Sequence, residues 1–101
     1  MIVKLTSQAE NDVAQAFRWY ERKREGLGVE FLNRVDEAIE IISSNPTLPA
    51  KLIGNARRTL LEQFPFAVWY VVTEEAIVIG CIHSKRDPSL ARKRMDGPKF
   101  T

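Results

Sequence analysis

The chain has 101 residues, a length that fits one domain spanning 1–101 and excludes a second of ordinary size. Hydrophobic residues make up 45% of it and charged residues 28%, a globular balance that excludes a disordered chain. The net charge of +2 conceals a basic second half. Residues 51–101 carry nine Lys and Arg against five Asp and Glu, whereas residues 1–50 carry six against eight. This asymmetry favours an anionic partner, either an acidic peptide or a nucleic acid.

The cysteine content and the first residues indicate where the protein works. The lone cysteine, Cys81, lies in an apolar run, so it has no partner for an internal disulfide and is expected to be a small core residue. Residues 1–6 lack the apolar region of a signal peptide, and no stretch is long enough to span a membrane. We therefore expect a cytoplasmic protein that makes no membrane contact.

A short strand and a long helix are expected first. The apolar stretch 2–5 predicts the strand. Ser7 followed by Glu10 matches the capping box, in which a serine hydroxyl and a glutamate carboxylate satisfy free N–H groups at a helix start. Apolar residues then recur every three or four positions and predict a helix that runs to about Arg24. Its apolar face consists of Ala9, Val13, Ala16, Phe17 and Tyr20.

A second helix is expected after two glycines. Gly26 and Gly28 end the first helix, since glycine readily adopts the left-handed conformation found there. Pro46 ends the second helix, because proline disfavours helical geometry in the residue before it. Two amphipathic helices joined by a short turn predict an antiparallel hairpin with a buried seam. The apolar stripe of the second helix consists of Phe31, Leu32, Val35, Ala38, Ile39 and Ile42.

The second half of the chain predicts a sheet. Residues 57–61 are expected to form a short strand, and the apolar runs 66–73 and 76–82 two antiparallel strands in the middle of the sheet. From Asp87 onward the chain is polar and basic, which predicts one short helix or a loose tail. The expected fold is α+β in the order β-α-α-β-β-β. An N-terminal strand and an antiparallel helical hairpin pack on a mainly antiparallel four-stranded sheet, followed by a short basic C-terminal segment.

Several short motifs, in this order and at this spacing, carry a resemblance that covers most of the chain, from about Leu5 to Arg94. Together they resemble the RelE/ParE toxin superfamily, and ParE-like toxins in particular. The motifs are Trp19-Tyr20-Glu21, Gly26-Leu27-Gly28 and Phe31-Leu32 in the helical region, then Ser44-Asn45-Pro46, Arg57-Arg58, Phe64-Pro65-Phe66, Tyr70 and His83-Ser84-Lys85-Arg86-Asp87-Pro88.

The resemblance implies the toxin of a bacterial type II toxin–antitoxin pair, neutralised by a cognate antitoxin encoded beside it. The RelE-like branch of the superfamily cleaves messenger RNA on the ribosome. The ParE-like branch is associated with inhibition of DNA gyrase and has no recognised catalytic centre. A homodimer and a toxin–antitoxin hetero-oligomer are both compatible with the sequence.

Three residues are candidates for a ribonuclease site. Cleavage of RNA without a metal needs a base, a cation that stabilises the phosphorane and an acid. His83 is the single histidine and the candidate base, Arg86 is the candidate phosphate ligand, and Arg58 is a second possible cation. Arg57 and Arg58 are adjacent on a strand and point to opposite faces, so at most one serves a given site. The alternative is structural: a His83 that hydrogen-bonds a carbonyl or carboxylate, and a turn in which Asp87 holds the local backbone while Arg86 pairs with a helix carboxylate.

The segment after Arg86 favours the ParE-like branch. RelE-like nucleases carry a tyrosine or another proton-transfer group there, whereas residues 89–95 contain no Tyr, His or Glu. The ParE-like interpretation assigns target binding to an exposed basic segment that contains Arg86, Arg92, Lys93 and Arg94. The alternatives are a ribosome-dependent nuclease and an inactive, antitoxin-binding member of the family. No metal or cofactor is expected, because one histidine and one cysteine do not suffice for a zinc site and the glycines form no phosphate loop.

Overall fold

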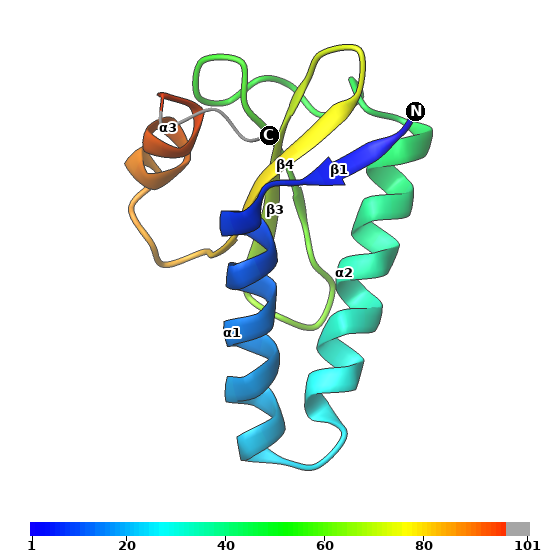
Figure 1. Ribbon diagram of the computed structural model, residues 1–101, viewed down its shortest axis with the longest axis vertical. Helices are drawn as coiled ribbons and strands as arrows, with labels where there is room; N and C mark the ends of the chain where they lie inside the picture. Colours follow the sequence, from blue (N-terminus) through cyan, green and yellow to red (C-terminus); the bar gives the residue numbers. More distant parts are fainter. Residues whose placement is uncertain (97–101) are drawn as a thin grey trace.

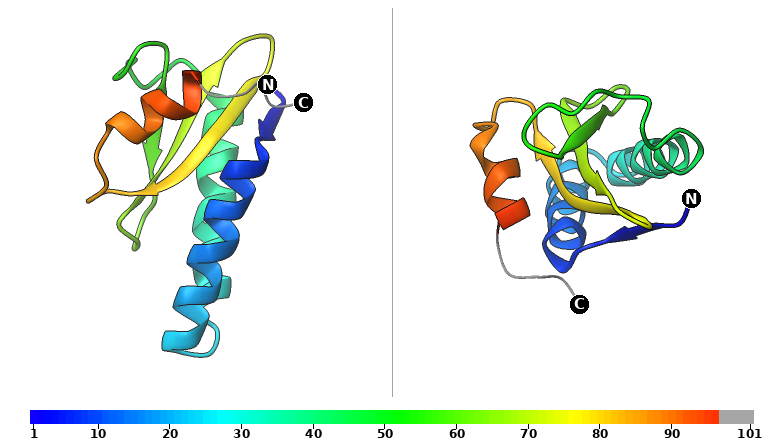
Figure 2. Two further views of the ribbon diagram at one scale, coloured as in Figure 1. Left: turned by 60° about the vertical axis from the view of Figure 1, so that its left-hand side comes forward. Right: turned by 90° about the horizontal axis from the view of Figure 1, so that it is seen from above.

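A four-stranded sheet carries helices on both of its faces (Figure 1; Figure 2). The structure, a computed structural model, describes residues 1–96. The strands lie in the order β1-β4-β3-β2, with β1 parallel to β4 and the other pairs antiparallel. This confirms the predicted α+β fold, its element order and its mainly antiparallel sheet. The elements are β1 (Val3–Leu5), α1 (Ser7–Lys23), α2 (Leu27–Ser44), β2 (Arg57–Leu60), β3 (Phe66–Val72), β4 (Ala76–His83) and α3 (Ser89–Asp96).

Helix α1 begins one residue earlier than the capping-box pattern indicates. The N-cap is Thr6, whose hydroxyl accepts a hydrogen bond from the Ala9 N–H at 3.1 Å, so the prediction of Ser7 as N-cap is wrong. The reason is a contact with the sheet. The Thr6 N–H donates to the Val78 carbonyl at 3.0 Å, which holds Thr6 in the extended conformation that an N-cap requires.

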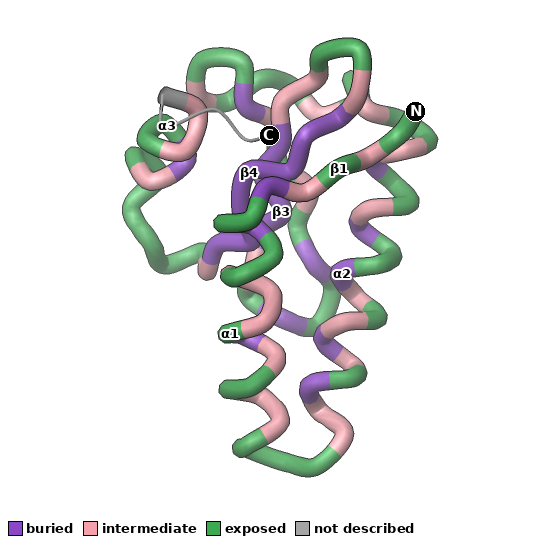
Figure 3. The backbone as a smooth tube through the Cα atoms, in the orientation of Figure 1, coloured by how far each residue is buried: buried purple, intermediate pink, exposed green. Residues whose placement is uncertain are grey.

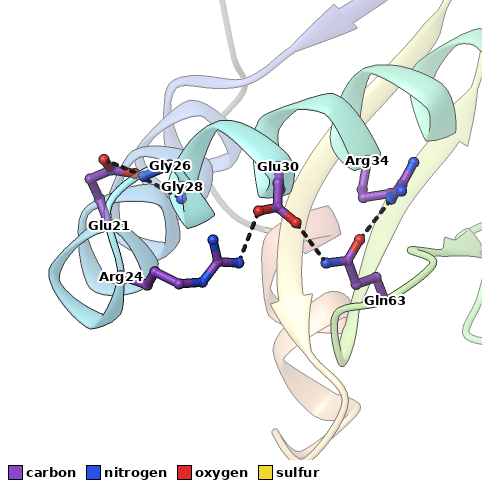
Figure 4. Close-up of polar contacts among 7 residues, drawn as sticks. All are labelled: Glu21, Arg24, Gly26, Gly28, Glu30, Arg34 and Gln63. Atoms are coloured by element: carbon purple, nitrogen blue, oxygen red, sulfur yellow. Dashed lines mark hydrogen bonds and ion pairs between the residues drawn. The ribbon is translucent and has the colours of Figure 1, made fainter.

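The turn between α1 and α2 is closed by the carboxylate of Glu21 (Figure 4). Its two oxygens accept the N–H groups of Gly26 and Gly28, each at 2.9 Å, at the otherwise unpaired start of α2. Gly26 has a φ of 89°, which few side chains tolerate. Gly28 is needed for space, since a Cβ there would lie 2.7 Å from the ring of Phe17. Glu21, Gly26 and Gly28, which belong to the motifs that resemble ParE-like toxins, therefore have structural roles in this turn.

A chain of polar contacts continues from this turn along α2 (Figure 4). Glu30 accepts from Arg24 at 2.9 Å and from Gln63 at 3.0 Å, and Gln63 in turn accepts from Arg34 at 3.2 Å. Gln63 lies in the loop between β2 and β3 and has a φ of 73°, unusual for a residue with a side chain. These contacts tie that loop to the helical hairpin.

The main core lies between the hairpin and the sheet. The predicted apolar faces of both helices contribute to it, which confirms the helical periodicity. Four aromatic rings of this core pack mainly edge to face, which is a favourable geometry for aromatic pairs. They belong to Tyr20, Phe31, Phe64 and Phe66.

A smaller cluster covers the other face of the sheet. It joins Trp69, Ile79 and Ile82 of the central strands to Ala56 and to Ala91 of α3. Both faces of β3 and β4 are thus covered, which explains why their sequences are almost continuously apolar rather than alternating (Figure 3). Within residues 1–96, no helix is both long and apolar enough to cross a membrane.

Candidate functional site

The three nuclease candidates meet at the end of β4. Arg58, His83 and Arg86 all line one small cavity of about 30 Å³ between the sheet and the start of α3. A volume of this size admits a water molecule but no nucleotide, so larger ligands would lie at its mouth. The remaining lining residues are Ala67, Trp69, Ile82, Ser84, Asp87, Pro88 and Ala91.

The hydrogen bonding of His83 opposes a role as a base. Its Nδ1 accepts the backbone N–H of Lys85 at 3.1 Å, and its ring packs edge to face on Phe66 at 5.1 Å. The neutral ring therefore carries its proton on Nε2, which leaves the ring with a donor and no free acceptor nitrogen. Proton abstraction by Nδ1 would require the loss of the bond to Lys85. His83 therefore closes the turn after β4, but the partner of its Nδ1 is a backbone N–H and not the carbonyl or carboxylate that the structural alternative predicted.

The two adjacent arginines of β2 point to opposite faces of the sheet, as predicted. Arg57 pairs with Tyr70 in register and sends its guanidinium towards the hairpin side, where it donates to the carbonyls of Thr47 and Pro49. Arg58 is exposed, and its guanidinium carbon lies 5.6 Å from the ring centroid of Trp69. Only Arg58 of the two is therefore available to the cavity.

The lining of the small cavity offers no general acid to act beside His83 and the arginines. Asp87 is the carboxylate in the cavity lining, and its Oδ1 accepts the Ser89 N–H at 2.9 Å. Hydrogen bonds from the Ser89 backbone and hydroxyl lower the pKa of Asp87, so it is ionised at neutral pH. Asp87 holds the turn before α3, as the structural alternative predicted. Arg86 is exposed and forms no ion pair with a side chain of residues 1–95, so the alternative in which it pairs with a helix carboxylate is wrong.

Arg94 is not part of an exposed basic segment, so that expectation is wrong. Its side chain is 14% exposed and forms an ion pair with Asp12 of α1 at 3.0 Å. The same guanidinium donates to the Ile79 carbonyl at 2.8 Å. Arg94 thus holds α3 against the sheet through these two contacts. Arg92 and Lys93 are exposed as expected, so with Arg86 they form the remaining basic surface of this region.

Two wider cavities lie beside the small one. The first, of about 250 Å³, separates α1 from α3 and is lined by His83, Arg86, Asp12 and Arg94 among others. The second, of about 450 Å³, is mainly apolar. His83 lines all three cavities, so they adjoin one another around the end of β4. The second cavity is lined by Ala16, Trp19, Tyr20, Pro65, Phe66 and His83.

The sequence pattern indicated neither the apolar cavity nor the role of Asp12. Trp19 is 49% exposed, which is high for so large an apolar side chain on a helix. Asp12 lies within the apolar stripe of α1, three residues after Ala9 and four before Ala16. A carboxylate on the buried face of a helix requires a cationic partner. The position of Asp12 in the sequence was therefore the signal that could have predicted its ion pair.

Cys81 is a core residue, as predicted. Burial, with a smaller contribution from the charge of Asp12, raises the pKa of its thiol to about 12. A thiol with this pKa stays protonated and unreactive at neutral pH. Among residues 1–95, whose side chains the structure describes, there is no group of three His, Cys, Asp or Glu side chains arranged to hold a metal ion.

Comparison with known proteins gives no match to a family model and none to a curated protein. A solved structure described as the chromosomal ParDE TA system from P. aeruginosa has the same architecture. The likeness has a TM-score of 0.73, covers 82% of this chain and 95% of that chain, and has a sequence identity of 17%. At this identity the likeness establishes the fold. The chain therefore shares the fold of the matched chain in that ParDE structure, which agrees with the resemblance of its motifs.

Proposed function

We propose that this chain is the toxin of a type II toxin–antitoxin pair. The observation that carries the proposal is the shared fold with a ParDE toxin–antitoxin structure over nearly the full length of the matched chain. A cognate antitoxin would neutralise the toxin by direct binding. The proposed targets of such toxins lie in the cytoplasm, so the protein would work there.

We further propose that the protein follows the ParE-like branch and inhibits DNA gyrase by binding it. The arrangement at the end of β4 supports a binding protein over a nuclease. His83 presents a donor, Asp87 is ionised, and no second proton-transfer group lines the small cavity. The exposed cations Arg58, Arg86 and Arg92 are free to contact an anionic surface of the target.

The apolar cavity beside Trp19 is the proposed contact for the antitoxin. A volume of about 450 Å³ with aromatic walls accommodates a large apolar side chain of a partner helix. Acidic residues on the same helix would meet Arg86 and Arg58 at the neighbouring cavities. Replacing Trp19 with Ala should weaken antitoxin binding about tenfold or more, an effect typical of a central aromatic contact. Replacing exposed Val29 with Ala on α2 should leave the affinity unchanged.

The test of function is induced expression of the chain alone in bacteria, with growth, transcript ends and plasmid supercoiling followed together. Growth arrest with altered supercoiling and intact transcripts is the expected result, and co-expression of the protein encoded beside the chain should relieve it. Arrest with cleaved transcripts and normal supercoiling would contradict gyrase inhibition. Normal growth would instead favour an inactive, antitoxin-binding member of the family.

A ribosome-dependent nuclease is the second candidate, because Arg58, His83 and Arg86 line one cavity. Two substitutions separate a chemical from a structural His83. His83→Asn supplies a carbonyl oxygen that can accept the Lys85 N–H but cannot transfer a proton, whereas His83→Ala supplies neither. A structural His83 predicts that the Asn variant still arrests growth. Loss of transcript cleavage in both variants, with the fold intact, would support the nuclease.

A further inference from the structure

Helix α3 depends on the rest of the protein for its stability. It has eight residues, and isolated helices shorter than about 12 residues are marginal in water. Its sequence is mostly polar, and Ala91 is its one fully buried side chain among residues 89–95. Leu90 and Met95 are partly buried against the smaller cluster. Hydrophobic burial alone therefore holds α3 weakly.

The strongest attachment of α3 is the ion pair between Arg94 of α3 and Asp12 of α1. Both side chains also bond to the backbone of β4, so the pair, called the clamp below, joins three elements. The guanidinium of Arg94 donates to both carboxylate oxygens of Asp12, at 3.0 and 3.2 Å, and to the Ile79 carbonyl at 2.8 Å. Asp12 also accepts the Cys81 N–H at 3.0 Å. Hydrogen bonds between charged, partly buried groups are stronger than neutral ones.

The clamp occupies the place where β1 leaves the sheet. Pairing between β1 and β4 ends at Leu5 and Val78, and the next backbone groups on that edge of β4 have no strand partner. The carbonyl of Ile79 and the N–H of Cys81 bond to Arg94 and Asp12 instead. Separation of α3 therefore leaves the Ile79 carbonyl of β4 without its partner, whereas the Cys81 N–H keeps its bond to Asp12 of α1.

Gly80 provides the room for the clamp. The register of β4 against β3 shifts at this point, with Trp69 opposite Gly80 and Tyr70 opposite Val78. A Cβ on Gly80 would lie 2.9 Å from Arg94 Nη1 and 3.2 Å from Asp12 Oδ2. A single methyl group at this position therefore displaces the clamp without removing a charge.

We propose that α3 is a releasable strap: it separates from the sheet as one unit while the hairpin and the four strands stay folded, and the Asp12–Arg94 clamp sets how often it does so. The connecting residues 84–88 are exposed, so they can move without breaking the core. Release uncovers the sheet face around Trp69 and opens the cavity shared by Arg58, His83 and Arg86 on its α3 side. The proposal concerns the folded chain by itself and stands whether or not the chain is a toxin.

The test combines amide hydrogen exchange with quenching of Trp69 fluorescence. A Trp19→Phe background leaves Trp69 as the single tryptophan, so acrylamide quenching reports on the face that α3 covers. Asp12→Asn keeps an acceptor for the Cys81 N–H and removes the charge from the clamp, and Gly80→Ala displaces the clamp sterically. Arg94→Gln removes its cation. Arg92→Gln, the same change at an exposed position of α3, is the matched control.

All three clamp variants should speed exchange in α3 roughly tenfold or more and increase quenching of Trp69, since a charge-assisted contact of this kind is lost. Protection in α1, α2 and β3 should stay at the level of the Arg92→Gln control. The proposal is overturned if α3 exchanges no faster in the clamp variants than in this control. It is also overturned if the hairpin and sheet lose protection as much as α3, because α3 would then be part of one global unit.

Discussion

The carboxylate of Glu21 accepts the backbone N–H of Gly28 at 2.9 Å, so the end of α1 caps the beginning of α2. The two residues are seven positions apart and belong to the same pair of motifs that resembles ParE-like toxins. Because Glu21 also accepts the Gly26 N–H, its carboxylate fixes both the turn and the relative direction of the helices.

Replacing Glu21 with Ala should lower the free energy of unfolding by about 1–2 kcal/mol, because the first N–H groups of α2 lose a charged acceptor. Urea denaturation followed by circular dichroism measures this change. Glu25→Ala, a nearby exposed substitution, serves as the control and should have little effect. Equal losses for the two variants would show that the cap contributes nothing.

The two glycines of this turn should respond differently to substitution. Alanine normally stabilises a helix relative to glycine by up to about 1 kcal/mol. At Gly28 it should instead destabilise by about 1–3 kcal/mol, since its Cβ meets Phe17 and Glu21 below 3 Å. At Gly26 nothing lies near the added atom and only the positive φ matters, so Gly26→Asn should cost less than about 1 kcal/mol. Thermal unfolding of both variants decides this; a stabilising Gly28→Ala would refute the steric argument.

Arg57 and Arg58 should differ in their effect on stability although they are neighbours. Arg57→Gln removes hydrogen bonds to two loop carbonyls, at Thr47 and Pro49, and should cost about 1–3 kcal/mol. Arg58→Gln loses only the contact with the Trp69 ring, at most about 1 kcal/mol at an exposed site. Chemical denaturation compares the pair. A larger loss at Arg58 than at Arg57 would contradict the assignment of faces.

The thiol of Cys81 should resist modification in the folded protein. Because burial raises its pKa to about 12, the reactive thiolate is scarce at pH 8, and a disulfide reagent should label it only after denaturation. The pKa in the unfolded chain is near the ordinary value of about 9. The contribution of the protonated Cys81 thiol to stability is therefore complete below about pH 9. The free energy of unfolding falls as the pH rises from about 9 towards 12, because the unfolded chain binds fewer protons than the folded chain in this range. Rapid labelling under native conditions at pH 8 would contradict this prediction, and a Cys81→Ala variant provides the unlabelled control.

Local patterns in the sequence predict most of the architecture. The spacing of apolar residues defines both helices, and the strand expected at 66–73 is observed at Phe66–Val72. Such patterns suffice because helical and strand periodicities are properties of neighbouring residues, and glycine and proline act on their own backbone. The candidate site was predicted in part: the sequence named Arg58, His83 and Arg86, and the structure brings them to one cavity.

The tertiary structure alone decided three points. It selected Thr6 over Ser7 as the N-cap, through the bond of the Thr6 N–H to Val78. It brought His83 together with Arg58 and Arg86 at one cavity. It withdrew Arg94 from the basic surface by pairing it with Asp12, 82 residues away. The third outcome has a physical reason: β1 ends before β4 does, and the Ile79 carbonyl and the Cys81 N–H of β4 bond to the side chains that the fold brings within reach.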